Sequence, residues 1–107
     1  MIPDAMLQEM KTLYSLFIAE NVKEEKREYY YKLINSIPDD LFDTKNPIKL
    51  RKVGTKLSCF LFSLNKELKE DGCDMNKLEK DMKEMTERYK KAMMRGMLWK
   101  PNVEILL

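Results

Sequence analysis

Hydrophobic positions recur along the chain at steps of three and four residues, which is the spacing of a helix buried on one side. The pattern is clearest between Asn46 and Asp71, where these residues form one stripe: Leu50, Val53, Leu57, Phe60, Leu61, Leu64 and Leu68. Asn46 and Pro47 favour the first turn of a helix, and Gly72 favours its end. The sequence therefore predicts one long helix over this segment, as the central element of the core.

Two further helices are predicted before the central one. The first runs from Pro3 to about Glu20, and its apolar face is wide enough for two neighbours: Met6, Leu7, Met10, Leu13, Tyr14, Phe17 and Ile18. The second runs from Asn21 to Ile37, with Asn21 and Glu24 spaced as a capping box. One continuous helix over both segments is the alternative.

A last helix is predicted beyond Gly72, with Asp74 as its N-cap and this apolar stripe: Met75, Leu78, Met82, Met85 and Tyr89. Because only a short turn separates it from the central helix, the two should pack as an antiparallel hairpin. The expected fold is all-α, a small bundle of three to four helices. It forms a single domain over residues 1–107, in which 98–107 are an apolar C-terminal tail.

Composition fits this fold and argues against catalysis. The chain has 107 residues, of which 44% are hydrophobic, and its three glycines and four prolines are few for a many-stranded β fold. Histidine is absent, which removes the usual general base and most zinc ligand sets. Carboxylate pairs such as Asp39 and Asp40 fall in a hydrophilic linker. We expect no enzyme activity, and hence no catalytic residues, no cofactor and no metal.

The cysteines and the N-terminus bear on location. Two cysteines are too few for a disulfide scaffold; we expect Cys59 in the core and Cys73 in a turn. The N-terminus lacks the basic segment of a secretory signal, and the longest apolar cluster, Leu57–Leu64, is too short to span a bilayer. The expected location is intracellular and reducing, cytoplasmic or nuclear, with no membrane partner.

Charge is unevenly distributed. Residues 1–44 contain five basic and nine acidic side chains, whereas residues 45–107 contain fifteen and nine. Cations without an intervening acid gather at the start of the central helix: Lys45, Lys49, Arg51, Lys52 and Lys56. A helix N-terminus is partially positive, so cations there are unfavourable unless an anion is near. This basic cluster is a candidate surface for a phosphate backbone or an acidic protein. A solvated face, or pairing with Asp39, Asp40 and Asp43, is the alternative.

The end of the chain offers a second candidate surface. Nine residues are methionine, which suits adaptable binding surfaces but fills a core equally well. The candidate partner contacts are these: Met93, Met97, Trp99, Ile105, Leu106 and Leu107. The tail either packs back on the bundle or binds a partner in a groove or at a sheet edge. The narrow seam of the last helix could also contact a second copy of the chain.

The run KLINSIPDDLFDTKNPIKLRKVGTKL, with WK near the end, loosely resembles the N-terminal helical domain of transcription elongation factors. The Ile-Gly pair that those domains carry after the threonine is missing, and the last helix is longer and more charged. The chain is therefore not assigned to that family.

Together these patterns favour a non-enzymatic helical module for protein–protein interaction or assembly. Its partner is a protein, and a second copy of this chain is one candidate. A nucleic-acid-associated protein that binds the phosphate backbone through the basic cluster is the alternative. The two differ in salt response, because only polyanion binding weakens steeply with added salt.

Overall fold

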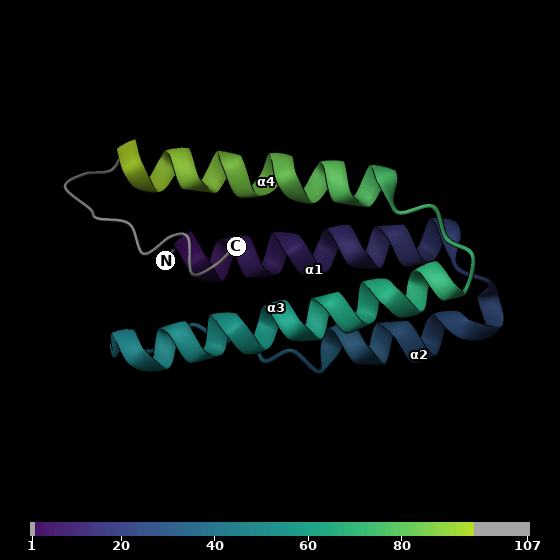
Figure 1. The fold of residues 1–107 in the computed structure, drawn as a ribbon, viewed down its shortest axis with the longest axis horizontal. Helices are drawn as coiled ribbons and strands as arrows, with labels where there is room; N and C mark the ends of the chain where they lie inside the picture. The colour runs from purple at the N-terminus through teal and green to yellow at the C-terminus, as the bar shows by residue number, and fades with distance from the viewer. Residues whose placement is uncertain (1, 96–107) are drawn as a thin grey trace.

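The computed structural model describes the backbone of residues 2–95 and the side chains of residues 4–92, and it contains helices and no strand within that range. The four helices are α1 (Ile2–Asn21), α2 (Glu24–Asn35), α3 (Pro47–Glu70) and α4 (Asn76–Arg95). In Figure 1, α1 lies between α4 and α3, and α2 runs beside the C-terminal half of α3. The all-α bundle predicted from the hydrophobic spacing is confirmed.

α1 is the helix on which α2 and α4 pack. It has extensive contacts with both α2 and α4. Its buried side chains cover a wide arc of the helix: Met6, Leu7, Met10, Tyr14, Phe17 and Ile18. The prediction that its broad apolar face meets two neighbours is therefore confirmed.

α1 and α2 are separate helices, so the alternative of one continuous helix is wrong. The expected capping box is also wrong. The amide of Asn21 donates to the carbonyl of Phe17 at 3.0 Å and stays in the last turn of α1. Lys23 precedes α2 without a side-chain cap. Val22 is buried at the break, and Arg27 donates to its carbonyl at 2.8 Å. Burial of this valine fixes the bend that a local capping motif was expected to fix.

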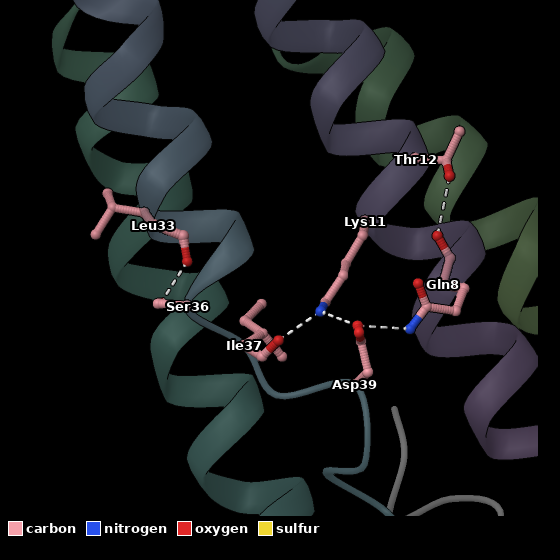
Figure 2. A network of polar contacts seen from close by, with 7 residues as sticks. All are labelled: Gln8, Lys11, Thr12, Leu33, Ser36, Ile37 and Asp39. Carbon is pink, nitrogen blue, oxygen red and sulfur yellow. Dashed lines mark hydrogen bonds and ion pairs between the residues drawn. The ribbon is translucent and has the colours of Figure 1, made fainter.

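The linker after α2 is tied to α1 by polar contacts (Figure 2). α2 ends at Asn35, two residues before the predicted Ile37, although Ile37 is buried. The Lys11 ammonium donates to the Ile37 carbonyl and pairs with Asp39 at 2.8 Å. The amide of Gln8 donates to the same Asp39 oxygen at 2.9 Å. These bonds, that of Lys11 foremost, lower the pKa of Asp39. The linker therefore has a defined path across α1.

α3 begins as predicted. The side chain of Asn46 accepts hydrogen bonds from the N–H groups of Ile48 at 2.9 Å and Lys49 at 3.4 Å. Pro47 occupies the first turn, where its missing N–H leaves no bond unmade. No acidic residue lies in this first turn.

α3 ends at the predicted glycine. Gly72 has φ +88°, and its N–H donates to the Lys69 carbonyl at 2.9 Å. The N–H of Cys73 donates to the Leu68 carbonyl at 3.0 Å, which completes a Schellman motif. Asp74 then accepts from the N–H of Asn76, the first residue of α4, at 3.0 Å. The turn thus leads directly from one helix into the next.

α3 and α4 run antiparallel, in agreement with the predicted direction of the hairpin (Figure 1). The main contacts of α4, however, are with α1. Met75, just before α4, and Leu78 and Met85 within it are buried as the stripe predicts. None of the helices described is both long and apolar enough to cross a bilayer.

The stripe of α3 is buried unevenly. Leu64 and Leu68 are buried, whereas the apolar stripe residues that precede them in α3 are only partly buried: Leu50, Val53, Leu57, Phe60 and Leu61. Cys59 is exposed, so its predicted place in the core is wrong. At 100° per residue Cys59 lies on the outer side of α3. Cys73 is partly buried, and both cysteines are free.

Candidate interaction sites

An apolar groove opens between α3 and α4, with a volume of about 400 Å³. α1, which lies between these two helices, contributes to its lining, as does the linker (Figure 1). The apolar residues that line it come from all four segments: Met6, Leu7, Met10, Phe42, Leu57, Leu61, Met82 and Met85. We call this site the α3/α4 groove.

The packing of α1 explains why the groove exists. α4 packs on α1, and α1 lies between α4 and α3 (Figure 1), so the facing sides of α3 and α4 are held apart. Leu57 and Leu61 on α3 and Met82 on α4 are therefore only partly buried. Half of the apolar lining residues are methionines, whose unbranched thioether side chains adapt to the shape of a ligand. Lys83 and Glu87 add charge of both signs to the lining.

A polar cluster holds α4 against α1 next to the groove. Arg88 donates to Glu9 with an Nη1–Oε1 distance of 3.1 Å, and the Tyr89 hydroxyl donates to the same carboxylate at 3.1 Å. The bond from Arg88 lowers the pKa of Glu9, and burial raises the pKa of Tyr89. Glu9 immediately precedes Met10 of the groove. The cluster therefore fixes the position of one groove wall relative to α1.

The five residues of the basic cluster are all exposed: Lys45, Lys49, Arg51, Lys52 and Lys56. None of them forms an ion pair with an acidic side chain of the described residues. The alternative of pairing with the upstream aspartates is not realised at Asp39, which binds Lys11 instead. At 100° per residue, the four members within α3 spread over the solvent-facing half of the helix. The structure thus leaves all five cations at the surface around the start of α3.

The outer face of α3 also exposes large apolar side chains that sequence reasoning missed. Phe62 is 74% exposed and Ile48 is 68% exposed. Both lie on the side of the helix that includes Cys59 and Lys52. A signal was available in the sequence, because Phe62 falls outside the stripe of three- and four-residue steps that defines the buried side of α3.

Met97, Trp99, Ile105, Leu106 and Leu107 lie outside the described residues, and so does the side chain of Met93. Their assignment as partner contacts remains a prediction.

Comparisons of the chain with protein-family models, with curated proteins and with solved structures find no match. Among the described residues, no group of three or more histidine, cysteine, aspartate or glutamate side chains is placed to hold a metal ion. A function must therefore be inferred from the α3/α4 groove and the basic cluster.

Proposed function

We propose that this chain is a non-enzymatic helical interaction module that binds an apolar, amphipathic helix of a partner protein in the α3/α4 groove. The supporting observation is the groove itself, which places partly buried leucine and methionine side chains between two helices. Grooves of this kind accept helices through apolar anchors at i, i+3, i+4 and i+7.

The energetics set the length of the partner. Each leucine or similar anchor that becomes fully buried contributes about 1.5–3 kcal/mol. Association itself costs about 4–15 kcal/mol in lost freedom of motion. One anchor is therefore insufficient, and a binder needs several anchors from consecutive helical turns. The volume of about 400 Å³ lies within the usual range for ligand pockets, so the helix would seat its anchors there and contact the rims of α3 and α4 with its flanks.

A synthetic amphipathic helix with leucine at those four positions and uncharged polar residues elsewhere is the probe for this function. We expect it to shift the methyl NMR signals of Met82 and Met85 in the groove, and to leave that of Met75 at the other end of α4 in place. Added salt should change the binding little, because the contact is apolar.

A matched pair of variants on α3 controls this experiment. Leu61→Lys places a charge in the groove wall and should abolish binding of the probe, whereas Phe62→Lys changes the neighbouring exposed residue and should retain it. Equal binding by both variants would place the contact elsewhere and refute the groove as the site.

A second candidate function is binding of a nucleic-acid phosphate backbone by the basic cluster. It is favoured by the exposure of all five cations and by their lack of ion pairs within the described residues. Lysine outnumbers arginine sixteen to four in the chain, which suits contact with phosphates as point charges rather than reading of bases.

Light scattering with and without a short mixed-sequence oligonucleotide distinguishes the two functions. If all five cations contact a single strand, a plot of the logarithm of the binding constant against the logarithm of the salt concentration should have a slope of about −3 to −4. The triple variant Lys49→Glu, Arg51→Glu and Lys52→Glu should abolish this binding and leave binding of the amphipathic helix unchanged. Oligonucleotide binding that survives the triple variant would exclude the basic cluster.

A further inference from the structure

We propose that the C-terminal segment of this chain, residues 97–107, occupies the α3/α4 groove of the same molecule when no partner is bound. This inference rests on the proposed function, because it identifies what a partner helix must displace. The segment would make the module self-inhibited: the partner binds only to the extent that it competes with the segment.

The position of α4 makes the groove reachable. The groove residues of α4 lie between Met82 and Glu87, and the helix is described to Arg95. At 1.5 Å per residue, the eight residues from Glu87 to Arg95 cover about 12 Å. The twelve residues after Arg95 reach up to about 40 Å when extended. The chain can therefore reverse, return over the last two turns of α4 and still have several residues to lay along the groove.

The residues that follow α4 favour such a reversal. Gly96 suits the left-handed conformation that ends many helices. Pro101 cannot continue a helix, and it biases Lys100 towards an extended conformation. The chain is therefore expected to leave the line of α4 within a few residues of Arg95.

The chemistry of the segment matches the groove. Seven of its eleven residues are apolar: Met97, Leu98, Trp99, Val103, Ile105, Leu106 and Leu107. Trp99 is its one aromatic residue, and the groove presents methionines from two helices, Met10 from α1 and Met82 and Met85 from α4. Contacts between thioether sulfur and an aromatic ring are favourable. Burial of this ring in the groove would remove from water both the apolar surface of the ring and the apolar surface of the groove.

The local concentration of the segment near its own groove favours binding within one molecule over binding by the segment of a second copy. A short covalent connection keeps the segment near its groove at an effective concentration of about millimolar. A second copy in a micromolar solution offers the same segment at a far lower concentration. The intramolecular arrangement should therefore dominate, and exchange between copies should occur only in concentrated solutions.

Trp99 is the sole tryptophan of the chain, so tryptophan fluorescence reports on this segment alone. In the full chain we expect emission at shorter wavelength, and weaker quenching by acrylamide, than in the same chain unfolded by denaturant. Emission and quenching equal to those of the unfolded chain would overturn the proposal.

Two variants locate the burial. Leu61→Lys in the groove wall should move the emission of Trp99 towards the unfolded value, and Phe62→Lys on the exposed face should not. Circular dichroism checks that both variants remain helical. Should Leu61→Lys unfold, Trp99→Ala serves in its place: it should shift the methyl NMR signals of Met82 and Met85 and leave Met75 in place. Unmoved signals of Met82 and Met85 would overturn the proposal.

Dilution and the probe helix separate the remaining outcomes. Dilution could weaken the protection of Trp99 from acrylamide and lower the solution mass at the same time. That result would assign the segment to a second copy and overturn the intramolecular arrangement. The leucine-containing probe helix should bind Trp99→Ala more tightly than the unchanged chain. Binding without protection of Trp99 refutes this inference alone, whereas protection with no probe binding to either chain refutes the proposed function alone.

Discussion

The two halves of α3 carry the same apolar stripe but differ in burial. In the C-terminal half, Leu64 is 2% exposed and Leu68 is fully buried, whereas Leu50, Val53 and Leu57 in the N-terminal half remain partly exposed. The helices that pack beside each half account for this difference in burial. α2 has only twelve residues and runs beside the C-terminal half alone (Figure 1). A stripe therefore specifies which side of a helix is available for burial, and the length of the packed neighbours decides how much of it is buried.

The polar contacts that α3 and its C-cap residue Asp71 make with other helices follow the same division. Near the C-terminal end of α3, the Tyr14 hydroxyl donates to Asn65 at 2.7 Å, and Asp71 accepts from Tyr30 and pairs with Lys26 at 2.7 Å. The bond from Lys26 is the main cause of the lowered pKa of Asp71. At the N-terminal end, the basic cluster has no such partners among the described residues. Side-chain contacts to α1 and α2 therefore hold the C-terminal end of α3, whereas its N-terminal end exposes the basic cluster.

The largest expected effect tests this contrast within a single helix. Leu68→Ala should lower the free energy of unfolding by about 2–5 kcal/mol, because it leaves a cavity in a fully buried site. Leu57→Ala should cost less, about 1 kcal/mol, because part of this side chain already contacts water. Urea unfolding of both variants measures the difference. Equal losses would show that the two halves are packed alike.

Alkaline pH should weaken the packed end selectively. Burial raises the pKa of Tyr14 from 10.0 to about 12. Between these pH values the unfolded chain ionises its tyrosine first, so the free energy of unfolding falls by up to about 2.7 kcal/mol as pH rises.

Unfolding titrations of the unchanged chain and Tyr14→Phe, below pH 10 and near pH 12, check this expectation. In Tyr14→Phe, much of the fall in the free energy of unfolding between these pH values should disappear. Burial also raises the pKa of Tyr30, which accounts for a remaining slope. An unchanged decline in Tyr14→Phe would contradict the assignment.

A smaller effect is expected at the turn that closes the packed end. Gly72→Ala should lower the free energy of unfolding by about 1–2 kcal/mol, because an L-residue is strained at φ +88°. An added Cβ would meet no atom within 4 Å, so the loss is one of backbone conformation alone. Gly72→Asn, which tolerates this conformation better, should lose less than alanine in thermal unfolding. An alanine variant as stable as the unchanged chain would refute the strain argument.

The smallest effect is a gain, at the open end. Lys49→Glu should raise the free energy of unfolding by about 0.3–1 kcal/mol, because it replaces a cation by an anion in the first turn of α3. Lys66→Glu, which lies before the last turn of the same helix, is the control and should change little. A loss of stability in Lys49→Glu would mean that this lysine already has an anionic neighbour in the folded chain.

Sequence reasoning succeeded where the determinants are local. The limits of α3 follow from the cap of Asn46 and the glycine at position 72, and both act on backbone atoms a few residues away. Apolar spacing likewise located all four helices. The capping box at Asn21 failed because burial of Val22 in the core sets the bend there. Cys59 was misplaced because an apolar cluster of eight residues necessarily surrounds the helix, and part of it must face outward.

The candidate sites were less predictable than the helices. The basic cluster is contiguous in sequence and could be recognised, yet its lack of a pair with Asp39 depends on Lys11, which is 28 residues earlier. The α3/α4 groove combines three helices and a linker, and it exists because α4 packs on α1. That arrangement depends on contacts such as Arg88 with Glu9, which are 79 residues apart and follow no local pattern.

The central place of α1 has a consequence for how the chain folds as it is synthesised. Of the four helices, α1 leaves the ribosome before the others, and α2 follows soon enough to cover one of its sides. The other side of α1 meets α4, and there Glu9 accepts a hydrogen bond from Arg88 in the folded chain. This side stays uncovered until nearly the whole described chain has emerged. Proteins are synthesised at about 5–20 residues per second, so the delay is about 4–16 seconds. During that interval Met6 and Met10 are exposed to chaperones and to other nascent chains.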